Sequence, residues 1–210
     1  MDSLTKKKAN NRSALTKAIT GGLCGLGAAL AFAGAAALAF SAPVLGQAPM
    51  ERPALASALE DCESGARDGA ADGRALGACD LLMRSPEFDD AMRARVLINR
   101  GVMALDRGLT RDARADLEQA VQLAPDTPEA WLNLSAARSR AGAHAEAVDA
   151  ARRARSLGGD EALSRFNEAI ALEHMGRYDE AYEAYVAAAG AAPGDATLQA
   201  QPRRFRRHQG

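Results

Sequence analysis

Histidine is the side chain of this sequence best suited to acid–base or metal chemistry, and it occurs three times, as His144, His174 and His208. None of the three lies at metal-ligand spacing from a second ligand, and none belongs to a nucleophile motif. The glycines between Gly21 and Gly27 fall inside an apolar segment and do not resemble a phosphate-binding loop. The sequence therefore gives no positive evidence for an enzyme, and we expect neither a cofactor nor a metal.

Asparagine is the one polar side chain that recurs in register. Asn99, Asn133 and Asn167 follow one another at a constant step of about 34 residues. An asparagine amide offers two donors and an acceptor, which suits the backbone of an extended peptide. The alternative is that each amide bonds to a neighbouring helix, and the sequence leaves both possibilities open.

These asparagines are part of an internal repeat that covers residues 94–195 in three units, 94–127, 128–161 and 162–195. Small residues let two helices approach closely, and glycine suits the left-handed position where a helix ends. Each unit is therefore predicted to be a helix, a tight turn and a second helix. The columns of small residues are Gly101, Ser135 and Ala169; Gly108, Gly142 and Gly176; Ala113, Ala147 and Ala181; and Ala120, Ala154 and Ala188.

The repeat resembles the tetratricopeptide repeat (TPR) family, whose signature is W-x2-L-G-x2-Y, then A-x3-F, then P, with the same period. Departures from the signature are Arg138, Ala151 and Arg165. The resemblance covers about half of the chain and implies an all-α fold, with helix-turn-helix repeats stacked as a right-handed superhelix. The matching residues are Leu97, Gly101, Ala104, Ala113, Leu117 and Pro125; then Trp131, Leu134 and Ala147; and then Ala169, Leu172, Ala181, Tyr185, Ala188 and Pro193.

The resemblance also implies a binding site, because in this family the first helices of the repeats line an inner groove. A protein or peptide is the expected ligand. Apolar and charged residues of both signs occur on that face, so the sequence predicts no charge preference. The predicted groove residues are Ile98, Asn99, Val102, Leu132, Asn133, Arg140, Phe166, Asn167, Ile170 and His174.

Residues 1–48 have the composition of an export segment. Five basic side chains and one acid precede a stretch, Gly21 to Phe40, that has no charged residue. A basic segment followed by an apolar one is typical of a signal peptide, although this stretch is also long enough to span a bilayer. We expect either a cleaved signal or a single-pass inner-membrane anchor within residues 19–40, with the rest of the protein in a bacterial periplasm. Without residues 1–48 the chain is mildly acidic, which gives no reason to expect nucleic acid as a partner.

Residues 49–93 are predicted to form a degenerate helical hairpin ahead of the array, with helices over 54–66 and 74–83. Cys62 lies on the first of these helices and Cys79 on the second. In an exported protein such a pair favours a disulfide, although two buried thiols that never pair are the alternative.

Residues 196–210 should form a short helix and an arginine-rich tail. Asp195 can cap this helix, and Pro202 is expected to stop it within two turns. An apolar face near Leu172, Tyr178 and Tyr185 would then be open for contact, unless the short helix and the tail cover it.

Two functional hypotheses follow. The first is a non-catalytic adaptor of the cell envelope that binds a peptide or protein in its groove. The second is a structural assembly factor that self-associates, or docks in an envelope complex, through its last repeat.

Overall fold

The computed structural model describes residues 52–69 and 73–206, and every helix or strand assigned in these ranges is an α-helix. The all-α prediction is confirmed. The expected signal or anchor within residues 1–48 lies outside the described residues, and no described helix is both long and apolar enough to cross a membrane. The helices are α2 (Arg52–Arg67), α3 (Gly73–Met83), α4 (Asp90–Asp106), α5 (Thr110–Leu123), α6 (Pro128–Arg140), α7 (His144–Ser156), α8 (Glu161–His174), α9 (Tyr178–Ala191) and α10 (Ala196–Arg206).

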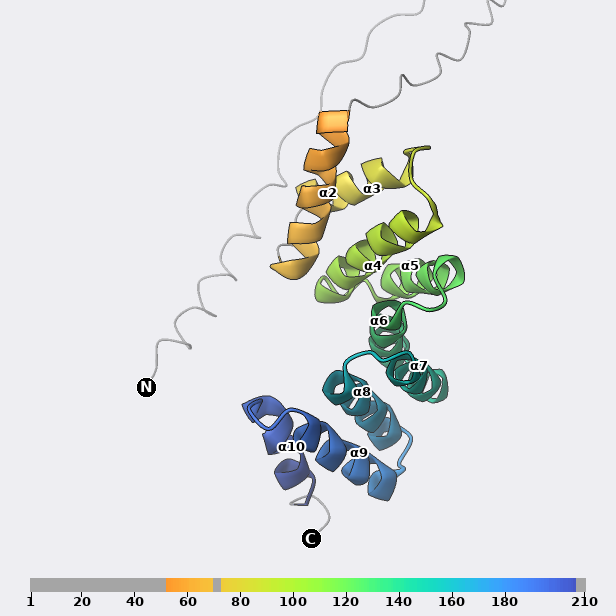
Figure 1. The fold of residues 1–210 in the computed structure, drawn as a ribbon. Helices are drawn as coiled ribbons and strands as arrows, with labels where there is room; N and C mark the ends of the chain where they lie inside the picture. Colours follow the sequence, from red (N-terminus) through yellow and green to blue (C-terminus); the bar gives the residue numbers. More distant parts are fainter. Residues whose placement is uncertain (1–51, 70–72, 207–210) are drawn as a thin grey trace, which may run out of the picture. The chain divides into compact units, whose positions relative to one another are not determined.

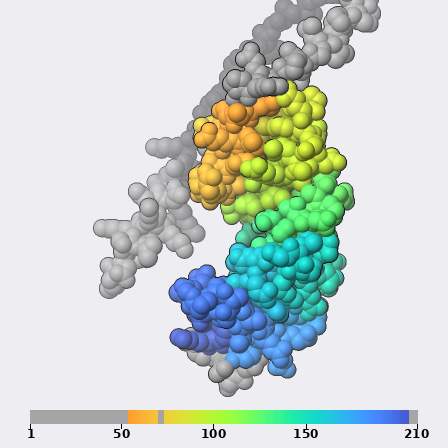
Figure 2. All heavy atoms as spheres, viewed as in Figure 1, coloured from red at the N-terminus to blue at the C-terminus, as the bar shows by residue number. Residues whose placement is uncertain are grey.

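The helices pair in chain order into hairpins, α2 with α3, α4 with α5, α6 with α7 and α8 with α9, and α10 packs on α9 (Figure 1). Each hairpin also contacts the next one, so that neighbouring hairpins lie directly against each other (Figure 2). The last three hairpins correspond to the three predicted repeats. Helix α4 begins at Asp90, where the side chain of Asp89 accepts a hydrogen bond from the Met92 amide at 2.9 Å.

The glycine column between the paired helices has the predicted left-handed backbone. Gly108, Gly142 and Gly176 have φ angles of 73°, 80° and 72°. In each turn the amide after the glycine donates back to a carbonyl near the end of the first helix, for example from Leu109 to Ala104 at 2.8 Å. This arrangement satisfies a carbonyl that the helix end leaves free, and it recurs because the repeat recurs.

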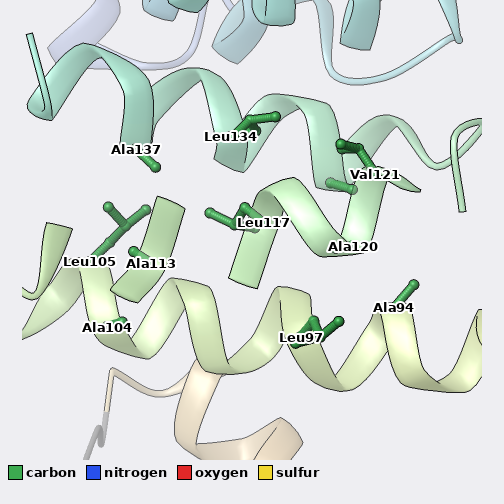
Figure 3. Close-up of a cluster of buried hydrophobic side chains, with 11 residues drawn as sticks. Ala94, Leu97, Ala104, Leu105, Ala113, Leu117, Ala120, Val121, Leu134 and Ala137 are labelled. Atoms are coloured by element: carbon green, nitrogen blue, oxygen red, sulfur yellow. The ribbon is translucent and has the colours of Figure 1, made fainter. Parts of the chain in front are cut away.

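The core between the first and second repeats is built mainly from alanine and leucine. One cluster joins α4, α5 and α6, and Figure 3 shows its side chains in the layer that these helices share. Leu97, Leu117 and Leu134 are fully buried there, which contributes roughly 1.5–3 kcal/mol for each side chain. Gly101 lets Leu117 approach, because a Cβ atom at Gly101 would lie 2.8 Å from the Leu117 Cγ atom.

Gly101→Ala is therefore expected to lower the free energy of unfolding by about 1–3 kcal/mol, the usual cost of overpacking. Gly77→Ala is the matched control, since that glycine is also in a helix but has no atom within 4 Å of the added Cβ. There alanine should stabilise the helix by roughly 0.5–1 kcal/mol. Urea denaturation of the two variants would measure the difference, and equal effects would contradict the packing explanation.

The N-terminal hairpin holds the two cysteines in contact. Cys62 of α2 and Cys79 of α3 are fully buried and joined in a disulfide. The Arg93 guanidinium connects this hairpin to the array, because it donates hydrogen bonds to the carbonyls of Met83, Ser85 and Phe88 at 3.0–3.3 Å. The first repeat thus packs against a hairpin, α2–α3, that is cross-linked by a disulfide.

Removal of the disulfide by Cys62→Ala with Cys79→Ala should lower the free energy of unfolding by about 3 kcal/mol, as the loop-entropy relation gives for a loop of this size. Thermal denaturation of the oxidised protein and the variant would measure the loss. A reducing agent should lower the stability of the unsubstituted protein and leave the variant unchanged. Equal sensitivity of both proteins would show that the bridge does not stabilise the hairpin.

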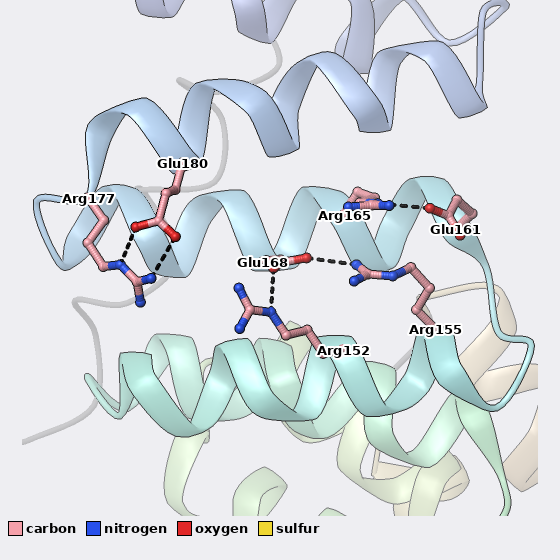
Figure 4. Close-up of polar contacts among 7 residues, drawn as sticks. All are labelled: Arg152, Arg155, Glu161, Arg165, Glu168, Arg177 and Glu180. Atoms are coloured by element: carbon pink, nitrogen blue, oxygen red, sulfur yellow. Dashed lines mark hydrogen bonds and ion pairs between the residues drawn. The ribbon is translucent and has the colours of Figure 1, made fainter.

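Two ion-pair clusters, each with one buried carboxylate, Asp116 or Glu168, lie where hairpins meet. The Arg100 guanidinium of α4 binds Asp116 of α5 through two hydrogen bonds of 2.6 and 2.7 Å and Asp80 of α3 at 2.6 Å. Glu168 of α8 accepts hydrogen bonds from Arg152 and Arg155 of α7 at 2.6 and 2.7 Å (Figure 4). The middle unit has a buried leucine, Leu134, at the same position of the repeat. In the first and third units this position therefore carries a charge, on the half-buried Arg100 and on the buried Glu168, that is paired with the adjoining helices.

The C-terminal prediction is wrong about Pro202. This proline lies inside α10, which continues to Arg206 instead of stopping within two turns. The predicted cap is confirmed, because the Asp195 carboxylate accepts hydrogen bonds from the Thr197 and Leu198 amides at 2.8 and 3.1 Å. The helix continues because Phe205 is 5% exposed, and its burial offsets the hydrogen bond that a proline removes.

Candidate partner-binding groove

The first helices of the three repeats form one wall. Helix α4 contacts α6, and α6 contacts α8. Each of the ten predicted groove residues lies on one of these helices, and none of the ten is buried. They are Ile98, Asn99 and Val102 on α4; Leu132, Asn133 and Arg140 on α6; and Phe166, Asn167, Ile170 and His174 on α8.

Two pockets lie along this wall. The first, between α6 and α8, has a volume of about 270 Å³. The second, between α4 and the start of α6, has a volume of about 400 Å³. Val102, Leu132 and Asn133 line neither pocket, although they lie on the same helices. The α6–α8 pocket is lined by Ala136, Ser139, Arg140, Phe166, Asn167, Ile170 and His174. The α4–α6 pocket is lined by Ala91, Ala94, Arg95, Ile98, Asn99, Thr127 and Glu129.

The three asparagines have different surroundings. Asn133 donates to the carbonyl of Glu129 in its own helix at 2.9 Å, and Asn167 donates to the Leu132 carbonyl of α6 at 3.3 Å. Asn99 lines the α4–α6 pocket. Asn167 thus bonds to a neighbouring helix, as the alternative interpretation of the column proposed, whereas Asn133 bonds within its own helix. Each of these two amides retains a carbonyl oxygen as an acceptor.

Arg140 both supports the wall and lines a pocket. Its Nη1 donates to the carbonyl of Leu105 in the last turn of α4 at 2.7 Å, which ties α6 to α4. The other nitrogens, Nε and Nη2, donate no hydrogen bond within the described ranges, and the side chain is exposed. Its remaining N–H groups are therefore available to a ligand.

Two histidines that are far apart in the sequence meet beside this pocket. The imidazole rings of His144, at the start of α7, and His174, at the end of α8, stack with centroids 4.8 Å apart and planes inclined by 13°. Sequence reasoning missed this pair, because the distance between the two residues along the chain follows neither a helical period nor a metal motif. Among the described residues no group of three metal-ligating side chains comes together.

The apolar face expected at the last repeat is largely closed. Leu172 and Tyr185 are each 1% exposed, and Phe205 of α10 packs among Tyr178, Tyr182 and Tyr185 with ring centroids 5.9–6.1 Å apart. Burial and a hydrogen bond to Glu173 raise the pKa of the Tyr185 hydroxyl. Only Tyr178 of the three predicted contact residues stays well exposed, at 54%. The expectation of an open face is wrong for Leu172 and Tyr185, and the alternative, a cover formed by the C-terminal segment, is what the structure shows.

Comparison with known proteins gives fold neighbours. No protein-family profile matches the sequence. A crystal structure of MamA protein is 24% identical, covers 75% of this chain and 83% of its own chain, and has a TM-score of 0.61. A MamA RS-1 double mutant is 13% identical with a TM-score of 0.62, covering 74% of this chain and 85% of its own.

A solved TPR domain is also among the structures that resemble this chain. The TPR domain of OM64 from Arabidopsis is 19% identical, has a TM-score of 0.53, and covers 57% of this chain and 98% of its own. The recurring columns of small residues, the repeated left-handed glycines and the paired helices agree with this likeness. The chain therefore has the fold of the tetratricopeptide repeat proteins.

Proposed function

We propose that this protein is a non-catalytic adaptor that binds an extended segment of a partner protein along α4, α6 and α8. The observation that supports it best is that all ten predicted groove residues are at least partly exposed on the first helices of the three repeats, with one pocket between α4 and α6 and another between α6 and α8. The amides of Asn99 and Asn167 lie at these two pockets, where they can bond to a peptide backbone.

The test fills one pocket without disturbing the core. Asn99→Trp should block the α4–α6 pocket, and Gln119→Trp, at an exposed position on the second helix α5, is the matched control. The full-length chain would be crosslinked in intact cells, and its partners identified by mass spectrometry. Loss of a partner with Asn99→Trp but not with Gln119→Trp supports binding along the first helices, and equal recovery with both variants contradicts it.

The proposed location is the bacterial cell envelope, either free in the periplasm or held by residues 19–40 in the inner membrane. The support is the order of a basic and then an apolar segment in residues 1–48, together with a cysteine pair in bonding contact. Fractionation of cells, combined with sequencing of the mature N-terminus, tests it. An intact N-terminus in the membrane fraction would identify an anchor, and a soluble cytoplasmic protein would contradict both forms.

The alternative, an assembly factor that docks through its last repeat, now depends on Tyr178, because Leu172 and Tyr185 are buried. Tyr178→Asp should leave partner capture unchanged if the first helices bind the partner. Loss of capture with Tyr178→Asp, and not with Asn99→Trp, would favour the assembly role instead.

A further inference from the structure

We infer that the pocket between α6 and α8 binds the carboxylate of an aspartate or glutamate side chain in the partner, next to an apolar side chain of the same segment. This inference rests on the proposed function and specifies the partner's chemistry. The sequence alone predicted no charge preference for the groove, because residues of both signs occur on its helices. In the structure the two groove pockets differ, because residues of both signs line the α4–α6 pocket and no acidic residue lines the α6–α8 pocket.

The α6–α8 pocket offers hydrogen-bond donors and no carboxylate. Among its seven lining residues are Arg140, the His174 imidazole and the Ser139 hydroxyl, and none is acidic. Two acids are sequence neighbours of lining residues, and both are bound elsewhere. Glu168 accepts hydrogen bonds from Arg152 and Arg155. Glu173 Oε2 accepts hydrogen bonds from the Tyr185 hydroxyl at 2.6 Å and from Arg204 at 3.4 Å. A ligand carboxylate in this pocket would therefore meet a guanidinium without a competing carboxylate.

The guanidinium is also oriented in advance. Because Arg140 Nη1 is fixed to the Leu105 carbonyl at 2.7 Å, less side-chain entropy is lost when Nε and Nη2 bind a carboxylate. Hydrogen bonds between a guanidinium and a carboxylate are among the strongest in proteins. Phe166 and Ile170 provide the apolar part of the lining, and each is partly exposed. The pocket thus fits a carboxylate that has an apolar neighbour.

The other groove pocket lacks this preference. In the α4–α6 pocket Arg95 is already paired with Glu63 at 2.5 Å, and Glu129 contributes a carboxylate to the lining. An anionic side chain of the partner would there face Arg95, whose charge Glu63 already balances, and would be repelled by the carboxylate of Glu129. The acidic residue of the partner is therefore assigned to the α6–α8 end of the groove.

A phage-displayed library of random dodecapeptides, joined at their C-termini to the coat protein, would be selected on the immobilised full-length chain. Selected sequences would be remade as amidated, fluorescein-labelled peptides, so that side chains supply the only carboxylates. We expect an aspartate or glutamate beside a large apolar residue, and replacement of that acid by its amide should weaken binding about tenfold or more. Arg140→Glu should weaken binding of the acidic peptide and strengthen binding of the same peptide with lysine in place of the acid. Arg140→Lys should retain the preference for the acidic peptide, and Arg95→Ala should leave that preference unchanged.

The outcomes separate the two claims. If neutral or basic peptides are selected, or if Arg140→Glu leaves the acid preference unchanged, the inference fails and the adaptor function stands. The inference fails in the same way if only a free C-terminal carboxylate improves binding. If no peptide is selected, or if Asn99→Trp does not weaken the selected peptides, the proposed function itself fails. Circular dichroism of each variant would confirm that the helical fold is retained.

Discussion

Glu168→Ala is expected to lower the free energy of unfolding by about 2–3 kcal/mol, because the partly exposed guanidinium groups of Arg152 and Arg155 lose their hydrogen bonds to a buried carboxylate. Glu168 is 5% exposed and accepts hydrogen bonds from Arg152 and Arg155 of the preceding repeat. Glu168→Leu should cost somewhat less, since a leucine fills the same position of the middle unit at Leu134 and leaves no cavity, although both variants leave Arg152 and Arg155 unpaired. Urea denaturation of both variants measures the two losses.

The pH dependence of this stability identifies the ion pair as its source. Burial by itself would raise the pKa of Glu168, but the hydrogen bonds from Arg155 and Arg152 outweigh it and lower the pKa below its ordinary value of 4.5. A carboxylate whose pKa is lower in the folded state stabilises the fold above about pH 4.5, and this contribution is lost as the pH falls through the folded-state pKa. The stability difference between the unsubstituted protein and Glu168→Gln should therefore shrink on acidification below pH 4.5.

Glu180 provides the matched control for this experiment. Its pKa is also lowered by a hydrogen bond from an arginine, Arg177, but the pair is exposed at the surface (Figure 4). Exposed ion pairs contribute little to stability, so Glu180→Gln should have no measurable effect. If Glu180→Gln and Glu168→Gln destabilise equally, burial is not what makes the Glu168 cluster important.

Phe205→Ala is expected to remove about 3–5 kcal/mol from the free energy that holds α10 against α9, the usual cost of deleting a buried phenylalanine side chain. Phe205 packs among three tyrosine rings, and α10 is the last described helix, so few other contacts can compensate. Hydrogen exchange should show loss of protection first in α10 and then in α9, where Tyr185 becomes exposed.

The control for this prediction is Arg203→Ala, which changes an exposed side chain of the same helix and should leave its protection unchanged. Equal protection of α10 in Phe205→Ala and in the unsubstituted protein would show that other contacts hold the helix.

The repeat period was enough to predict the architecture. Small residues at a fixed step and a glycine between paired helices are local requirements of helix packing and of the left-handed turn, so they are readable in sequence. The position of the groove residues on the first helices followed from the same period, through the family resemblance. A disulfide was favoured because the two cysteines fall on neighbouring antiparallel helices of a chain with an export segment.

Tertiary structure decided which charges are buried and which are free. The sequence shows Arg100 and Glu168 at a core position of the repeat, but only the packed helices bring Asp116, Arg152 and Arg155 within hydrogen-bond distance. It likewise decided that Phe205 covers the last repeat despite Pro202. Local sequence determined where most of the helices form and turn, but not at Pro202, where burial of Phe205 lets the helix continue. Pairing of charges and closure of surfaces depend on residues from different helices, whose distances no sequence period specifies.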